Sequence, residues 1–87
     1  MAESYKVTST TWVEDGAAYV SYSETVTIEA TNVSWDYATE LAGELIDKWL
    51  AAEKHPAKRV DDGWRHVAYV EMWPKAWGIR VDIDRTS

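Results

Sequence analysis

The feature that most constrains this fold is one amphipathic helix, predicted in the middle of the chain between two hairpin-like segments. From Ser34 to about Lys54, apolar residues recur at steps of three and four, which is the spacing of one helix face. Ser34 is suited to cap the first turn, and Pro56 prevents the helix from continuing. The inward face is predicted to contain Ala38, Leu41, Ala42, Leu45, Trp49 and Ala52, widened by Trp35, Ile46 and Leu50.

The segment before the helix predicts a β-hairpin. Residues 5–14 and 17–30 are rich in Thr, Val and aromatic residues, and Asp15-Gly16 is the preferred pair for a two-residue type I′ turn. Pairing across that turn places Thr11 opposite Val20 and Trp12 opposite Tyr19. A bulge near Ser23-Glu24 is expected, because Glu24 interrupts the apolar row. That row contains Tyr5, Val7, Val13, Val20, Tyr22, Val26 and Ile28.

The segment after the helix predicts a second hairpin. Residues 57–63 are predicted to be a connection, residues 64–72 and 77–84 alternate as strands do, and residues 73–76 suit a four-residue loop with Pro at its second position. The expected cross-strand pairs are Met72–Trp77, Val70–Ile79, Tyr69–Arg80 and Arg65–Asp84.

The predicted fold class is α+β, with the element order β-β-α-β-β. Two hairpins form a four-stranded sheet, and one helix packs on one face of it. Eighty-seven residues are expected to make a single domain spanning 1–87, because a second domain would leave neither with an adequate core. This element order resembles the β-grasp arrangement of the immunoglobulin-binding domains of proteins G and L. In that fold the first strand is central, whereas residues 5–14 are Thr-rich and weakly apolar here. The resemblance concerns the element order, and no binding residue is carried over from it.

The composition of the chain argues against nucleic-acid binding, disulfide bonds and a membrane span. Nine Lys and Arg against fifteen Asp and Glu give a net charge of −6, which disfavours direct nucleic-acid binding because phosphate contacts require cationic side chains. There is no cysteine, hence no disulfide. No apolar run has the ~20 residues that a membrane span needs, and the polar N-terminus does not have the pattern of a signal peptide. The chain is therefore expected in the cytoplasm.

The titratable residues do not suggest an enzyme. His55 falls at a helix end and His66 on a predicted core face, where a structural role is the expected one. Asp82 and Asp84 share a strand face with arginines nearby, which favours ion pairs over a cation site. We predict no catalytic residue, no metal and no cofactor.

Two surfaces are candidates for binding another protein. Asp36, Glu40, Glu44 and Asp47 follow at helical steps and form an acidic ridge, which could meet a basic partner or be an ordinary solvated face. The aromatic residues are unusually many, with six Trp and five Tyr. Not all fit inside so small a core, and exposed aromatics are common anchors in interfaces. The candidates for an aromatic sheet face are Trp12, Tyr19, Tyr69 and Trp73.

The sequence therefore predicts a small, acidic, non-enzymatic protein-binding module. In size and charge it is similar to small phage-encoded inhibitors, including anti-CRISPR proteins, which implies inhibition by surface mimicry or occlusion. The alternative is a structural homo-oligomer, such as a homodimer, that assembles through its sheet face or its edge strands.

Overall fold

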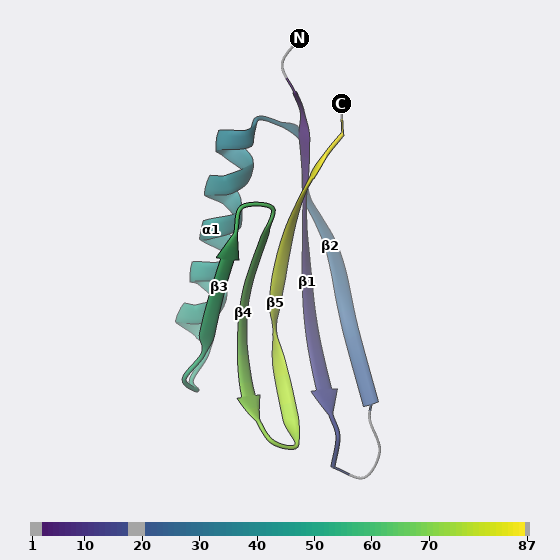
Figure 1. Ribbon diagram of the computed structural model, residues 1–87, viewed down its shortest axis with the longest axis vertical. Helices are drawn as coiled ribbons and strands as arrows, with labels where there is room; N and C mark the ends of the chain where they lie inside the picture. The colour runs from purple at the N-terminus through teal and green to yellow at the C-terminus, as the bar shows by residue number, and fades with distance from the viewer. Residues whose placement is uncertain (1–2, 18–20, 87) are drawn as a thin grey trace.

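The computed structural model describes residues 3–17 and 21–86, and in this part of the chain one helix lies on one face of a five-stranded antiparallel sheet (Figure 1). The strands lie in the order β2-β1-β5-β4-β3, so that β2 and β3 are the two edges. The longest dimension is 52 Å. The elements in chain order are β1 (Tyr5–Asp15), β2 (Ser21–Val33), α1 (Trp35–Ala52), β3 (Lys58–Asp62), β4 (Arg65–Met72) and β5 (Lys75–Arg85).

The predicted α+β class is confirmed, but the predicted number of strands is wrong. Among the described residues there are five strands, because the segment predicted as a connection contains β3. β3 pairs along its whole length with β4, from Lys58–Tyr69 to Asp62–Arg65. Its sequence has two charged residues on each side of Val60 and lacks the apolar pattern by which strands are recognised.

The helix begins where the sequence indicates. The Ser34 hydroxyl accepts a hydrogen bond from the Tyr37 amide at 3.1 Å, and α1 follows from Trp35. At the other end the Glu53 amide donates to the carbonyls of Trp49 and Leu50, at 3.1 and 3.2 Å. The helix thus ends at Ala52, two residues before the predicted end at about Lys54, and its last turn is closed by these backbone hydrogen bonds.

The core lies between α1 and the helix-facing side of the sheet. Ala38, Ala42 and Ile46 are fully buried on the helix, and the two alanines allow its backbone to approach the sheet closely. Burial of one large aliphatic side chain stabilises the fold by about 1.5–3 kcal/mol. Leu41, Leu45, Trp49 and Leu50 are partly buried around this centre. The sheet contributes Tyr5, Val7, Ala68, Ile79, Val81 and Ile83.

The first hairpin does not have the predicted register. Asp15 pairs with Ser21, so the predicted turn residue Asp15 belongs to the ladder. Thr11 lies opposite Thr25, five residues beyond its predicted partner Val20. Because side chains alternate between faces, an odd shift moves every side chain of the strand to the other face. Tyr22, Val26 and Ile28 therefore lie on the face away from the helix and are exposed. Val20 lies outside the described residues.

A bulge does occur in β2, but later than predicted. Pairing is regular from Asp15–Ser21 to Thr8–Ile28 and then shifts, because Val7 lies opposite Ala30. This irregularity at Glu29 returns Ala30 to the helix side, and a second shift between Val7 and Tyr5 brings Val33 to the same side. Both residues pack against the core. The Ser9 hydroxyl donates to Glu29 across the strands at 2.6 Å.

The second hairpin has shifted by an even number of residues. Met72 pairs with Lys75, so the connection is the two-residue turn Trp73-Pro74 rather than the predicted four-residue loop. Each β4 residue lies two positions away from its predicted partner, and Arg65 is opposite Asp82 instead of Asp84. An even shift leaves each side chain on its predicted face. The buried residues Ala68 and Val70 accordingly face the helix, as expected.

Candidate functional site

The sheet face opposite α1, which we call the open face, has no described element packed over it (Figure 1). Its rows follow from the strand registers. The central row crosses all five described strands, and its members are Glu24, Trp12, Gly78, Tyr69 and Lys58.

Gly78 allows the two aromatic side chains of that row to approach each other. A Cβ at Gly78 would lie 2.7 Å from the Trp12 ring, 2.8 Å from the Tyr69 Cβ and 2.4 Å from the Ala68 carbonyl oxygen. Only a residue without a side chain fits there, and the Trp12 indole occupies the vacant space. The Lys58 ammonium lies over the Tyr69 ring at 6.0 Å from its centroid, at the limit of a cation–π contact.

The β2 side of the open face is apolar except at Glu24. Tyr22, Val26 and Ile28 project from it at alternate positions and are 53%, 57% and 62% exposed. The sequence pattern assigned them to the core, and only the register could have placed them outside. Val60, on β3 at the opposite edge of the same face, is 53% exposed.

The β4–β5 side of the open face is held by ion pairs. Arg65 donates to Asp82 at 2.7 Å, and Arg80 donates to the other oxygen of the same carboxylate at 2.9 Å. Hydrogen bonding to Asp82 raises the pKa of Arg65. The arginine environment of Asp82 agrees with the predicted ion pairing, although the partner of Arg65 was predicted to be Asp84.

The four aromatic residues predicted to form one surface do not all lie together. Trp12 and Tyr69 lie in the same row on either side of Gly78. Trp73 is in the turn between β4 and β5 and is 78% exposed, at the end of the sheet rather than on its face. Trp12 pairs with Glu24 and not with Tyr19 as predicted, and Tyr19 lies outside the described residues.

The acidic ridge on α1 is exposed at all four positions, Asp36, Glu40, Glu44 and Asp47. Within the described part of the chain, no ion pair reaches the first three. Asp47 is different, because it accepts a hydrogen bond from the Arg59 guanidinium at 2.6 Å. The ridge therefore consists of three unpaired carboxylates and one carboxylate that ties the helix to β3.

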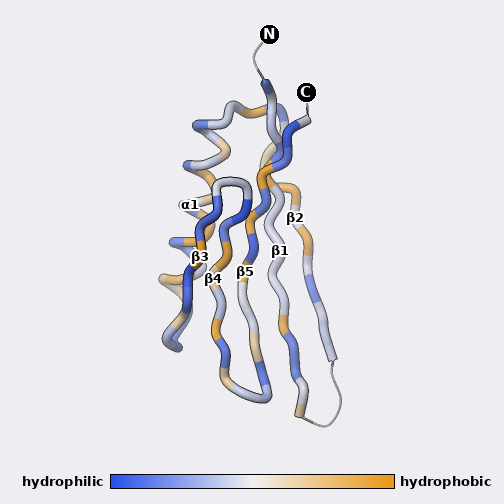
Figure 2. The backbone as a smooth tube through the Cα atoms, viewed as in Figure 1, coloured by the Kyte–Doolittle hydropathy of each residue, from blue (hydrophilic) through white to orange (hydrophobic). Residues whose placement is uncertain are grey.

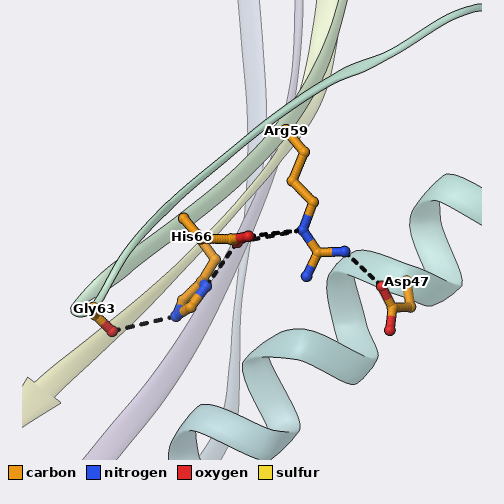
Figure 3. Close-up of polar contacts among 5 residues, drawn as sticks. Asp47, Arg59, Gly63 and His66 are labelled. Carbon is orange, nitrogen blue, oxygen red and sulfur yellow. Dashed lines mark hydrogen bonds and ion pairs between the residues drawn. The ribbon is translucent and has the colours of Figure 1, made fainter.

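The Arg59 contact belongs to a polar network that fixes the β3 edge (Figure 3). Arg59 also donates to Asp61 at 3.0 Å, and Asp61 lies 2.9 Å from His66 Nδ1. The other ring nitrogen of His66 is 3.2 Å from the Gly63 carbonyl oxygen. The hydrogen bond from His66, with the nearby Arg59 charge, holds the pKa of Asp61 below its usual value. Both His66 nitrogens are engaged, which makes this histidine part of the edge structure.

A second carboxylate organises the C-terminal end of the helix. Glu53 accepts from the Trp77 indole at 2.7 Å, from the Lys54 amide at 3.0 Å and from the His55 amide at 3.2 Å. His55 Nδ1 lies 2.9 Å from the same carboxylate. These hydrogen bonds, the one from Trp77 above all, lower the pKa of Glu53 from 4.5 to about 2. His55 and Trp77 also meet edge to face, at 5.3 Å between ring centroids.

A small cavity of about 100 Å³ lies between β1 and β2, lined by Thr11, Trp12, Val13, Ser23, Glu24 and Thr25. Ligand pockets usually measure ~300–1,000 Å³. Across residues 3–17 and 21–86, no group of three or more His, Cys, Asp or Glu side chains is arranged to hold a metal ion. In the same residues, no helix combines the length and the hydrophobicity needed to cross a membrane.

No protein-family model, curated protein or solved structure matches this chain. The resemblances to β-grasp domains and to small phage inhibitors stay predictions. The open face and the acidic ridge are the two candidate binding surfaces that the geometry defines.

Proposed function

We propose that this protein is a non-enzymatic protein-binding module of the cytoplasm, and that it binds its partner through the open face. The observation that carries this proposal is the exposure of apolar side chains on a sheet face that no described element covers. Tyr22, Val26 and Ile28 are each more than half exposed there. Contiguous apolar patches on soluble proteins commonly mark interaction sites.

The central row supplies the kind of anchor that such a site uses. Trp12 and Tyr69 are half-buried, held by the sheet on either side of Gly78. An aromatic side chain fixed before binding loses little conformational entropy when a partner covers it. Trp and Tyr are also enriched among the residues that contribute most to binding. Lys58 and Glu24 carry opposite charges at the two ends of the row and would form a polar rim.

The acidic ridge supports a second candidate, a phage-type inhibitor that binds a basic partner by surface mimicry. Asp36, Glu40 and Glu44 are four residues apart, so successive carboxylates are about 6 Å apart along the helix axis. Like charges at this spacing destabilise a helix slightly, and they would be compensated by a cationic partner surface.

Affinity capture with two double variants separates these candidates. Trp12→Ala/Tyr69→Ala removes the open-face anchors, and Glu40→Lys/Glu44→Lys reverses the ridge. Trp73→Ala is the matched control, because it deletes an exposed Trp that lies outside both surfaces. The proposal predicts that the wild type, the ridge variant and the control retain the same partner, identified by mass spectrometry, and that the open-face variant loses it.

The opposite result would assign binding to the helix. If both double variants captured the wild-type partner equally well, neither surface would be the binding site. Circular dichroism of each variant establishes that a loss of capture does not arise from unfolding.

A further inference from the structure

We infer that β2 pairs with β2 of a second copy of this chain, antiparallel and about a two-fold axis perpendicular to the sheet. This inference rests on the edge strands and does not require that the open face bind another protein. The two sheets would join into one, with both helices on one side and both open faces on the other.

The first observation is that β2 is an unprotected edge. Its residues Ser21–Glu29 are all exposed, and β1 occupies one side of the strand only. Sheets usually protect their edges with short strands, charges, prolines or covering segments. β2 has thirteen residues, no Pro, no Gly, no Lys and no Arg. Figure 2 shows β2 mainly pale and orange, whereas β3 is mainly blue.

The second observation is that the regular part of β2 is self-complementary. Pairing with β1 is unbroken from Ser21 to Ile28, so this stretch offers a straight edge. Like faces stay together only in registers where paired residue numbers differ by an even number. The register centred on Glu24 would place that carboxylate opposite its own copy, which is unfavourable. The next register, centred on Thr25, avoids this.

Centring on Thr25 pairs the exposed side chains of β2 with each other. Tyr22 then lies opposite Ile28 of the second copy, and the same pair recurs through the symmetry. Pairs between aromatic and β-branched side chains stabilise antiparallel sheets. Glu24 lies opposite Val26 of the second copy, and Thr25 meets its own equivalent on the helix side. Two partly exposed apolar strips are thereby joined into one.

The size of this contact sets the expected affinity. Seven residues, 22–28, pair within the straight stretch and span about 24 Å, so the interface lies at or below the lower end of the 1,200–2,000 Å² or so that specific interfaces bury. We therefore expect a reversible dimer with a dissociation constant in the micromolar range. Each copy carries a net charge of −6, so added salt should strengthen the association by screening repulsion.

Sedimentation equilibrium between about 10 µM and about 1 mM, a range that brackets the affinity of small interfaces, tests the inference. The wild type should shift from monomer to dimer as concentration rises. Val26→Glu should weaken dimerisation at least tenfold, because it places a second carboxylate directly opposite Glu24 of the other copy. Val60→Glu is the matched control: Val60 is 53% exposed and Val26 57%, on opposite edges of the same face. It should dimerise as the wild type does.

Because the chain has no cysteine, single-cysteine variants test the same contact independently. In the expected register Thr25→Cys brings two equivalent Cα atoms to about 4.5–5.5 Å, within the range that a disulfide bridges. Crosslinked dimers of Thr25→Cys, but not of Val60→Cys, would support the inference. A wild type that stays monomeric throughout the range, or equal crosslinking of Val60→Cys, would overturn it.

Discussion

The two edges of the sheet are built from opposite kinds of sequence. β3 is five residues long, carries four charged side chains around one valine, and is tied to the helix through Arg59 and Asp47. β2 is thirteen residues long, carries two carboxylates and no cation, and meets the helix mainly at its end. Charge and shortness make β3 unsuitable for pairing with a further strand, whereas β2 retains a long edge that is regular from Ser21 to Ile28 and carries no cation. We conclude that an edge becomes available for association through its side chains as much as through its free backbone groups.

The largest loss of stability is expected at Gly78, which lies in the row of the sheet that connects the two edge strands. We expect Gly78→Ala to lower the free energy of unfolding by about 3 kcal/mol, at the upper end of the usual cost of overpacking, because the new Cβ meets backbone and two aromatic side chains. Urea denaturation measures this. The matched control is Gly43→Ala on the helix, where a Cβ meets nothing within 4 Å. That substitution should stabilise by up to about 1 kcal/mol, and equal effects of both would contradict the close approach at Gly78.

Asp61→Asn should weaken the fixed edge. The carboxylate receives hydrogen bonds from Arg59 and His66, and its side chain is 45% exposed, so a loss of about 1 kcal/mol of unfolding free energy is expected. Asp62→Asn, the adjacent carboxylate on the other face of β3, is the control and should change stability less. If the two variants lost the same free energy, the network in Figure 3 would not stabilise the edge.

Acid should affect the helix side of the molecule through Glu53. Its pKa is lowered from 4.5 to about 2 in the folded state, so its stabilising contribution is complete above pH 4.5. That contribution is lost as the pH falls through about 2, where the folded carboxylate becomes protonated. Glu53→Gln should therefore flatten the fall in unfolding free energy between these pH values, as measured by denaturation at a series of pH values. A slope identical to that of the wild type would show that the hydrogen bonds to Glu53 do not favour its ionised form.

The smallest expected effect is on the acidic ridge. Glu40→Lys replaces repulsion with attraction toward Asp36 and Glu44. It should raise the free energy of unfolding by a few tenths of a kcal/mol, which is measured as a slightly higher thermal midpoint. Added salt should diminish this gain, because the three side chains are exposed. A lower midpoint would mean that Glu40 makes a stabilising contact in the folded state.

The helix was the most predictable element, because its signals are local. The Ser34 cap and the three- and four-residue spacing place its start correctly, and they place its inward face correctly except at Ala52, which is exposed. The strands depend on register, which the sequence specifies poorly when the loop length is unknown. The error of two residues in the second hairpin kept Ala68 and Val70 on the core side. The error of five residues in the first hairpin placed Val26 and Ile28 on the core face, whereas they lie on the exposed face.

The candidate site was predictable only in part, for the same reason. Trp12 and Tyr69 were expected on an exposed sheet face, but their common row is created by Gly78, whose role depends on residues distant in the chain. β3 could not be recognised from its sequence, because its charged residues show no strand pattern. One of them, Arg59, is fixed by Asp47 of the preceding helix, a contact between distant residues. Contacts of this kind leave no periodic pattern in the sequence.

Amide hydrogen exchange of the wild-type protein, measured by NMR at low and high protein concentration, tests the difference between the two edges most directly. The outward-facing amides of β2 should exchange at least tenfold more slowly in the concentrated sample, because they become hydrogen-bonded to a second copy. The outward-facing amides of β3 should exchange at the same rate in both samples. Concentration-independent exchange at β2, or slowing at β3 instead, would contradict the assignment of β2 as the associating edge.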